Sequence, residues 1–188
     1  GRRVEETTIQ EHGVRHTVRL FTGQKTGFYL DQRLARRRVM ELARGREVAD
    51  LCSYQGAFSL AALQGGAESV VAVDVSPAGL AAGAGLAAAH DVRVRWVEAD
   101  LDAGFPRDDD RYDVVVCQRF RDPALYPALR AALAPGGLLV VTVLSEVGDT
   151  GGPFRAVPGE LTAAFAGLEV LAHGEGDGEA HLVASLPA

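Results

Sequence analysis

The sequence predicts an α/β domain: a doubly wound, mostly parallel seven-stranded sheet with an antiparallel terminal hairpin, preceded by a small N-terminal β-hairpin. Three observations support this fold class. Residues 48–76 read as a strand, a sharp turn, a helix and a second strand. Strand and helix patterns then alternate as far as residue 144. Two final strands face each other across a Gly-rich turn, which adds the antiparallel ending.

The beginning of the chain is expected to form a β-hairpin and a helix. Apolar and polar residues alternate over 7–21, and His12 and Gly13 supply the turn. Asp31 can cap a following helix that runs to about Ala43. The hairpin would therefore stand directly before the helix that leads into the sheet.

The stretch 48–76 has the form of the first βαβ unit of a Rossmann-like, nucleotide-binding domain. Its second strand ends in Asp74, where an acid can accept hydrogen bonds from ribose hydroxyls. The turn CSYQGA holds one glycine, whereas a dinucleotide fingerprint holds three. Asp50, inside the first strand, would repel a pyrophosphate and attract a cation. These features favour S-adenosylmethionine (SAM), with its positive sulfonium and amino groups, as the cofactor.

The remaining elements follow from hydrophobic period and turn residues. The run GDTGGP over 148–153 is expected to be a loop. The expected elements are a helix over 77–90, a strand that begins at 92 and ends near 98–100, a strand over 112–117, a helix over 122–133, a strand over 138–144, a short helix over 160–166, and terminal strands over 168–172 and 181–185.

Ligands of doubly wound sheets bind at the carboxyl ends of the strands, and this rule selects the candidate site residues. Residues 53–56 are expected to contact the amino-acid part of SAM. Cys117 and Gln118, followed by Arg119 and Phe120, would line the place where methyl donor and acceptor meet, so the first two are the catalytic candidates. The expected cofactor contacts are Asp50, Ser53, Tyr54, Gln55, Gly56, the ribose-side Asp74 and Val75, the adenine-side Asp100 and Leu101, and Gln118.

Composition narrows the class of protein. The 188 residues, 47% of them hydrophobic, suit one compact domain. The sequence has no apolar run of membrane-spanning length and no secretory signal, so we expect a cytoplasmic enzyme with no membrane partner. The two cysteines, Cys52 and Cys117, are far apart, which predicts neither a disulfide scaffold nor a metal site. Cys52 is assigned to the core or the turn. The oligomeric state is left open.

Charge is unevenly distributed along the chain. The formal net charge is −6, and residues 1–47 hold eleven Lys/Arg against six Asp/Glu. This balance of +5 leaves −11 for the rest. A basic first quarter can face a phosphate-rich substrate or can be an ordinary solvated face. Arg36, Arg37 and Arg38 are consecutive on a predicted helix, so they spread over a wide arc and cannot form one tight phosphate clamp.

Residues 11–79 resemble the catalytic domain of the bacterial 23S rRNA cytosine-C5 methyltransferases that also carry a PUA domain. The segments EHGVRHTVRL, GQKTGFYLDQR and CSYQGAFSLAALQGGAESVVAVDVS carry the resemblance. It implies a class I SAM-dependent methyltransferase fold over 31–188, after a hairpin and cofactor-side loop over 1–30. It also implies that the loop of Gln24, Lys25 and Thr26, and the residues Asp31, Gln32 and Arg33, lie beside the cofactor. The ten residues given before this segment are not expected to form a PUA domain.

The second half departs from that family. The Asp-Pro-Pro that follows the fourth strand in the family is replaced by CQRFRDPALYPALR. Residues 111–188 instead resemble small-molecule methyltransferases of the tellurite-resistance type, through LRAALAPGGLLVVTVL, PFRAVPGEL and FAGLEVL. The acidic body and this altered motif favour a methyltransferase of a small-molecule or other non-RNA acceptor.

Two alternatives stay open. GQKTGFYLDQR and the basic first quarter favour an RNA base methyltransferase of the cytosine-C5 type. In that chemistry a cysteine thiolate first adds to the ring, and Cys117 is the candidate nucleophile. Alternatively, intact cofactor positions beside an altered catalytic motif would suit a SAM-binding module without catalytic activity.

Overall fold

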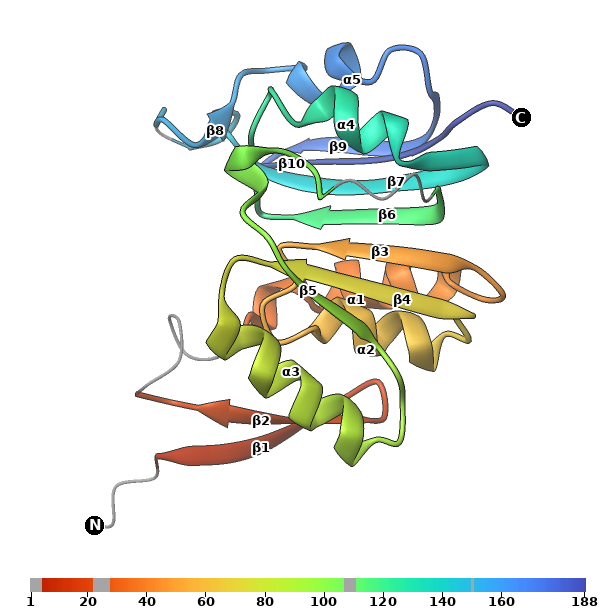
Figure 1. The fold of residues 1–188 in the computed structure, drawn as a ribbon. Helices are drawn as coiled ribbons and strands as arrows, with labels where there is room; N and C mark the ends of the chain where they lie inside the picture. The colour runs from red at the N-terminus through yellow and green to blue at the C-terminus, as the bar shows by residue number, and fades with distance from the viewer. Residues whose placement is uncertain (1–4, 22–27, 107–110, 150) are drawn as a thin grey trace.

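The computed structural model describes residues 5–21, 28–106, 111–149 and 151–188. Within these residues one sheet has the strand order β5-β4-β3-β6-β7-β10-β9, with β8 paired to β7 beside this path (Figure 1). The strands are β3 (Glu47–Leu51), β4 (Ser69–Asp74), β5 (Arg95–Glu98), β6 (Tyr112–Gln118), β7 (Leu133–Ser145), β8 (Arg155–Ala156), β9 (Glu169–Gly176) and β10 (Glu179–Ser185).

The predicted fold class is confirmed. β3 pairs in parallel with both β4 and β6, so the strand order reverses on either side of it. β10 pairs antiparallel with β7 and β9, which gives the expected terminal hairpin. From β3 the chain connections run toward β4 on one side of the sheet and toward β6 on the other. This reversal opens a crevice at the carboxyl ends of β3 and β6.

Helices cover both faces of the sheet. One core contains Val48 and Val116 of the strands together with Val39 of α1 and Phe58 of α2. The other contains Leu51 and side chains of α4 and α5. The helical segments are η1 (Leu30–Gln32), α1 (Arg33–Leu42), α2 (Ala57–Gln64), α3 (Pro77–Ala89), η2 (Leu101–Ala103), α4 (Tyr126–Ala131) and α5 (Glu160–Ala164). None of the described helices is long and apolar enough to cross a membrane.

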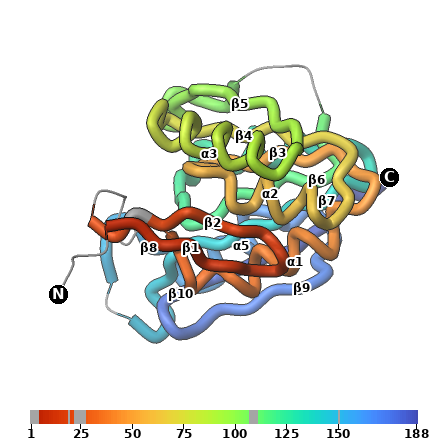
Figure 2. The backbone as a smooth tube through the Cα atoms, turned by 90° about the horizontal axis from the view of Figure 1, so that it is seen from below, coloured from red at the N-terminus to blue at the C-terminus, as the bar shows by residue number. Residues whose placement is uncertain are grey.

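The N-terminal hairpin is confirmed as β1 (Glu6–Glu11) and β2 (Val14–Arg19). His12 and Gly13 have φ values of 50° and 86°, as a tight hairpin turn requires. Both views place the hairpin at one end of the domain, beside α3 (Figure 1, Figure 2). Val14 packs on Leu60 of α2 and Ala87 of α3, so the hairpin is part of the folded domain.

A buried ion pair fixes the hairpin to α1. Nε and Nη2 of Arg36 donate to the Glu11 carboxylate at 2.5 and 3.0 Å, and Nη2 also donates to the Tyr29 carbonyl oxygen at 2.9 Å. The guanidinium lies over the Phe28 ring, 4.5 Å from its centroid. Burial alone would raise the pKa of Glu11, but the hydrogen bonds and charge of Arg36 lower it. The carboxylate is therefore held in its charged form.

Some predicted boundaries differ from the structure. The strand expected to begin at Val92 and to end near Glu98 is β5, over Arg95–Glu98; its end agrees, but its start is later because Val92 and Val94 pack toward the hairpin instead of pairing with β4. The helix expected from residue 122 begins at Tyr126, because the Asp122 carboxylate accepts from the Ala124 N–H and forms a turn. The two-residue strand β8 was not expected.

Asp31 does not cap a helix. It lies within η1, α1 begins after Gln32, and neither segment has a side-chain cap. The Asp31 carboxylate instead accepts from Nη2 of Arg119 at 2.9 Å, across 88 residues of sequence. A tertiary ion pair thus replaces the local hydrogen bond that the sequence pattern predicted.

Candidate cofactor and substrate site

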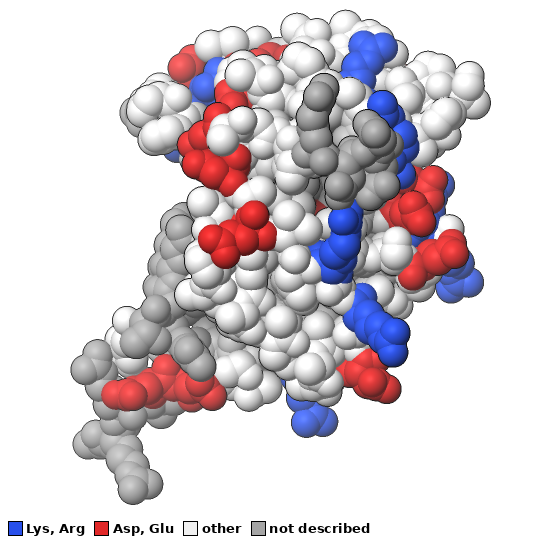
Figure 3. Space-filling model, in the orientation of Figure 1, with Lys and Arg blue, Asp and Glu red and all other residues white. Residues whose placement is uncertain are grey.

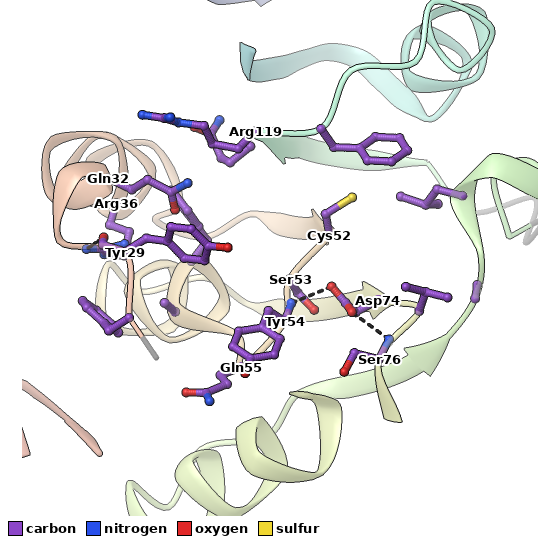
Figure 4. A pocket seen from close by; sticks show the side chains of 18 of the residues that line it. Tyr29, Gln32, Arg36, Cys52, Ser53, Tyr54, Gln55, Asp74, Ser76 and Arg119 are labelled. Atoms are coloured by element: carbon purple, nitrogen blue, oxygen red, sulfur yellow. Dashed lines mark hydrogen bonds between the residues drawn. The ribbon is translucent and has the colours of Figure 1, made fainter. Parts of the chain in front are cut away.

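A cavity of about 510 Å³ opens where the crevice was expected. A volume in this range suits a ligand of cofactor size. Figure 4 shows its wall from close by. Its lining residues come from the segment before α1, the β3–α2 turn and the ends of β4, β5 and β6: Phe28, Tyr29, Gln32, Arg36, Cys52, Ser53, Tyr54, Gln55, Ala57, Phe58, Asp74, Val75, Ser76, Ala99, Asp100, Leu101, Asp102, Gln118, Arg119 and Phe120.

The β3–α2 turn has an unusual backbone. Cys52, Tyr54 and Gly56 all have left-handed φ values, 55°, 47° and 70°. Such conformations cost energy in residues other than glycine and persist where the surroundings enforce them. A side chain on Gly56 would collide with the ring of Trp96 from β5, so only glycine fits there. The turn is therefore held in one shape, with its backbone against the cavity.

Asp74 helps to hold the β3–α2 turn in this shape. Its Oδ2 accepts from the Tyr54 N–H and its Oδ1 from the Ser76 N–H, both at 2.8 Å (Figure 4). The side chain is nearly buried but lines the cavity. A carboxylate has about four acceptor positions, so two backbone bonds leave each oxygen able to accept from a ligand hydroxyl.

Two buried polar atoms on the cavity wall lack a hydrogen-bond partner within the described part of the chain. They are Oγ of Ser53 and Oε1 of Gln118. Nε2 of Gln118 donates to the Val140 carbonyl oxygen at 3.1 Å, which fixes the orientation of the amide. An unpaired buried acceptor costs about 1–3 kcal/mol, so a hydrogen-bond partner for either atom would stabilise the site.

Asp50 lies beneath the cavity and is not among its lining residues. It is 1% exposed, and its Oδ2 accepts from both N and Oγ of Ser59, at 2.9 and 2.6 Å. Burial raises the pKa of Asp50 to about 7, against the opposing effect of these hydrogen bonds. The structure thus connects Asp50 to the first turn of α2, beneath the turn that faces the cavity.

Only one of the two cysteines lies where it was expected. Cys52 lies in the β3–α2 turn, as assigned, and also lines the cavity, whereas Cys117, expected at the meeting place of donor and acceptor, is 1% exposed and does not line it. The Cys117 Sγ lies 3.9 Å from the Phe120 carbonyl oxygen. A hydrogen bond with the Cys117 thiol, together with burial, raises the pKa of the Cys52 thiol. Cys52 is therefore held in its neutral form at physiological pH.

Arg36 is a site residue that the sequence pattern missed. Arg37 and Arg38 are exposed beside Glu41, but Arg36 is 1% exposed and lines the cavity. Figure 4 shows Tyr29, Gln32 and Arg36 on the opposite side of the cavity from Asp74. One signal was available, because Arg36 shares a helix face with the buried Val39, three residues later.

Arg119 connects distant segments at the cavity wall. Its Nη2 pairs with Asp31 at 2.9 Å and with Glu179 of β10 at 2.5 Å. Its φ of 60° is also left-handed, directly after β6.

The remaining candidate residues fall into three groups. Tyr54, Gln55, Val75, Asp100 and Leu101 line the cavity, Gly56 lies in the turn behind it, and Lys25 and Thr26 lie outside the described residues.

A known family model matches most of the chain. Residues 1–126 match the model of a family described as S-adenosylmethionine-dependent methyltransferase. The chain belongs to this family. This is the class of protein that the sequence predicted.

Two curated relatives of the chain are named as ribosomal RNA methyltransferases. A "Ribosomal RNA large subunit methyltransferase" of Deinococcus radiodurans is 37% identical over 161 residues, covering 72% of this chain and 38% of the relative. "Ribosomal RNA large subunit methyltransferase I" of Vibrio campbellii is 46% identical over 72 residues, 38% of this chain and 18% of the relative. This methyltransferase chain thus spans well under half the length of the relatives that it matches.

Solved structures confirm the fold. The methyltransferase SMU.776, complexed with SAH, has a TM-score of 0.79 at 19% identity, covering 99% of this chain and 57% of that one. The 16S rRNA methyltransferase RsmC of T. thermophilus, in complex with AdoMet and guanosine, has a TM-score of 0.69 at 20% identity, with 96% and 50% coverage. At these identities the likeness concerns the fold alone.

The preferred acceptor class predicted from the sequence was wrong. The altered second half favoured a small-molecule or other non-RNA acceptor, but both curated relatives named above are ribosomal RNA large-subunit methyltransferases. The segment that resembles these relatives is therefore a better indicator of the acceptor class than the segment that departs from the cytosine-C5 pattern. TehB of Haemophilus influenzae, at 18% identity and a TM-score of 0.72, shares the fold only.

Proposed function

We propose that this methyltransferase domain transfers a methyl group from SAM to a base of large-subunit ribosomal RNA. The observation that carries the proposal is the 37% identity with the Deinococcus relative over 72% of the chain. The cavity supports it, because the end of β6 and the β3–α2 turn meet there and leave two polar atoms unpaired. When bound, SAM supplies an activated methyl group on a sulfonium.

The chain's residues fit this cofactor. We assign Asp74 to the ribose hydroxyls, because its oxygens keep acceptor capacity on the cavity side. Val75, Asp100 and Leu101 follow on the neighbouring strand ends and would flank the adenine. Ser53, whose Oγ is unpaired, would receive a hydrogen bond from the methionine part.

The far end of the cavity supplies a cation for the cofactor carboxylate. We assign this role to Arg36, a residue that lines the cavity across from Asp74 (Figure 4). Its bonds to Glu11 and to the Tyr29 carbonyl fix it in place without reorganisation. Lys25 and Thr26, which lie outside the described residues, remain proposed cofactor contacts.

Asp50 has a positioning role in this proposal. Its hydrogen bonds to Ser59 hold the start of α2, and α2 in turn holds the β3–α2 turn. A direct contact with the cofactor is not part of the assignment, because Asp50 does not line the cavity. The residue therefore acts through the backbone of the turn.

Charge on the surface limits how RNA is held. Figure 3 shows, on the face in view, a column of Lys and Arg side chains that runs along most of the height of the molecule, with acidic side chains beside it. Among the described residues this face therefore presents a narrow basic column and not a broad basic patch, although residues 1–47 carry a balance of +5. Since the relatives are more than twice as long, we assign much of their RNA affinity to regions outside the matched part.

The test uses the full chain, tritium-labelled SAM and deproteinised bacterial ribosomal RNA, with large- and small-subunit RNAs separated afterwards. Label in large-subunit RNA is the expected result, and the Asp74→Ala variant should abolish it at the same SAM concentration. A chain that binds SAM but labels no ribosomal RNA would contradict the proposal. Incorporation should also fall steeply as salt is raised, because phosphate contacts release counterions.

A further inference from the structure

We infer that Trp96 of β5 is a positioning residue for SAM: its indole holds the β3–α2 turn in the shape that contacts the cofactor. Trp96 is half-buried and is not among the residues that line the cavity, so it acts through the turn and not by touching the ligand. The inference rests on the cofactor assignments of the proposed function and is independent of the RNA acceptor.

The outer edge of the indole lies against the end of the turn. A methyl group on Gly56 would collide with Cη2 of Trp96 and would lie 3.0 Å from Cζ3, so the ring packs directly on the Gly56 backbone. Gly56 has a φ of 70° and immediately precedes α2. The two residues before it, Tyr54 and Gln55, line the cavity. The indole therefore supports, from outside the cavity, a turn whose other residues form the cavity wall.

The same edge of the indole also touches α3. A methyl group on Gly83 would lie 2.5 and 2.8 Å from Cη2 and Cζ3 of Trp96, and 2.9 Å from the Gln55 carbonyl oxygen. Ring, helix and turn therefore meet here with no room for a side chain. One helical turn earlier, a methyl group on Gly79 would lie 2.6 Å from Cδ2 of Tyr54. Residues four apart share a helix face, so α3 packs two glycines against the turn and its supporting ring.

These contacts join three segments that we assign to the cofactor. The β3–α2 turn would hold the methionine part, and α3 begins directly after Ser76, on the ribose side. β5, which carries Trp96, leads to Asp100 on the adenine side. Trp96 pairs with Ala72 of β4, so the sheet fixes the point from which the indole extends. One side chain outside the cavity thus links the parts of its wall.

The turn needs this support because its backbone is strained. Cys52 and Tyr54 have left-handed φ values, which persist only where the surroundings enforce them. Asp74 holds the Tyr54 N–H, and Trp96 with α3 holds the end of the turn at Gly56. Without the indole the turn can adopt other shapes, and the apparent affinity for a ligand falls with the fraction that keeps the binding shape. If about one tenth keeps it, Kd rises about tenfold.

The first test removes the indole. Trp96→Leu should raise the Kd for SAH about tenfold in isothermal titration and the KM for SAM by a similar factor, while kcat at saturating SAM stays within about threefold. Val92→Ala is a matched control, because Val92 packs on the same buried cluster as Trp96 but does not line the cofactor cavity. It should lower the melting temperature and leave Kd within about twofold.

Two results of this test would overturn the inference. One is a folded Trp96→Leu protein whose Kd for SAH stays within about twofold of the wild type. The other is a loss of turnover that saturating SAM does not restore, since a residue that only shapes the cofactor site acts on binding.

The second test keeps the indole and adds a methyl group to α3. Gly83→Ala should weaken SAH binding by at least about threefold, because the methyl group presses on Trp96 and the turn. Gly85→Ala, in the same helix with open space around it, should leave Kd unchanged. Combined with Trp96→Leu, Gly83→Ala should weaken binding by less than the product of the two separate effects, because both act on one contact. Effects that multiply would overturn the inference.

Asp74→Ala separates this inference from the cofactor assignment. If Asp74→Ala loses SAH binding while the Trp96 and Gly83 variants keep it, the inference is overturned and the proposed function stands. If the wild-type chain does not bind SAH, both are overturned.

Discussion

Replacing Asp74 with alanine should weaken SAM binding by about 100-fold. The carboxylate already accepts two backbone N–H groups at 2.8 Å, and we assign two ribose hydroxyls to its remaining acceptor positions. A hydrogen bond to a charged group contributes about 1.5–3 kcal/mol, so losing two costs at least about 3 kcal/mol. Each 1.4 kcal/mol is tenfold in Kd, which gives about 100-fold. The loosened Tyr54 N–H adds to this loss.

Isothermal titration with SAH measures the effect without turnover. Asp122→Ala is a matched control, because Asp122 also caps a backbone N–H in a loop but does not line the cavity. The control should leave Kd within about twofold. An Asp74→Ala protein that melts like the wild type and binds SAH within about threefold would refute the ribose assignment.

Three further predictions concern stability. Because burial raises the pKa of Asp50 from 3.8 to about 7, the folded protein holds an extra proton between these values. Its free energy of unfolding should therefore fall as pH rises from about 4 to about 7, and Asp50→Asn should flatten that slope in urea titrations. Glu11→Ala leaves the buried Arg36 charge unpaired and should cost about 3 kcal/mol in urea unfolding, against at most about 0.5 kcal/mol for the exposed Glu41→Ala. Gly83→Ala should lower the melting temperature, because its Cβ would lie 2.5 Å from the Trp96 ring and 2.9 Å from the Gln55 carbonyl oxygen. Gly85→Ala, in the same helix with open space around it, should raise the melting temperature, because alanine favours helix by about 1 kcal/mol.

Local patterns were sufficient for the βαβ unit. Alternating apolar residues, a sharp turn and a terminal acid all lie within 48–76, so propensity and spacing determine the arrangement. The terminal hairpin and the N-terminal hairpin were predictable for the same reason, since each is closed by turn residues of its own. In these segments the residues that decide the structure are near neighbours in sequence.

The site depends on contacts that no local pattern contains. Arg36 looks like Arg37 and Arg38 in sequence, yet only Arg36 turns inward, toward Glu11 from 25 residues earlier. Cys52 reaches the cavity because the left-handed backbone of the turn directs it there. The predicted acceptor class was wrong for a related reason. The missing Asp-Pro-Pro motif was taken as a sign of a different substrate, whereas the identity with rRNA methyltransferases lies in other residues.

The two halves of the chain meet at the cavity. Asp74 and the β3–α2 turn come from the segment that resembles the rRNA methyltransferases, and Gln118 comes from the segment that departs from them. Arg119 joins the halves, because it pairs with Asp31 of the first and Glu179 of the second. We therefore expect a substitution at the end of β6 to leave unchanged the wall formed by β3 and β4, which carries the proposed cofactor contacts.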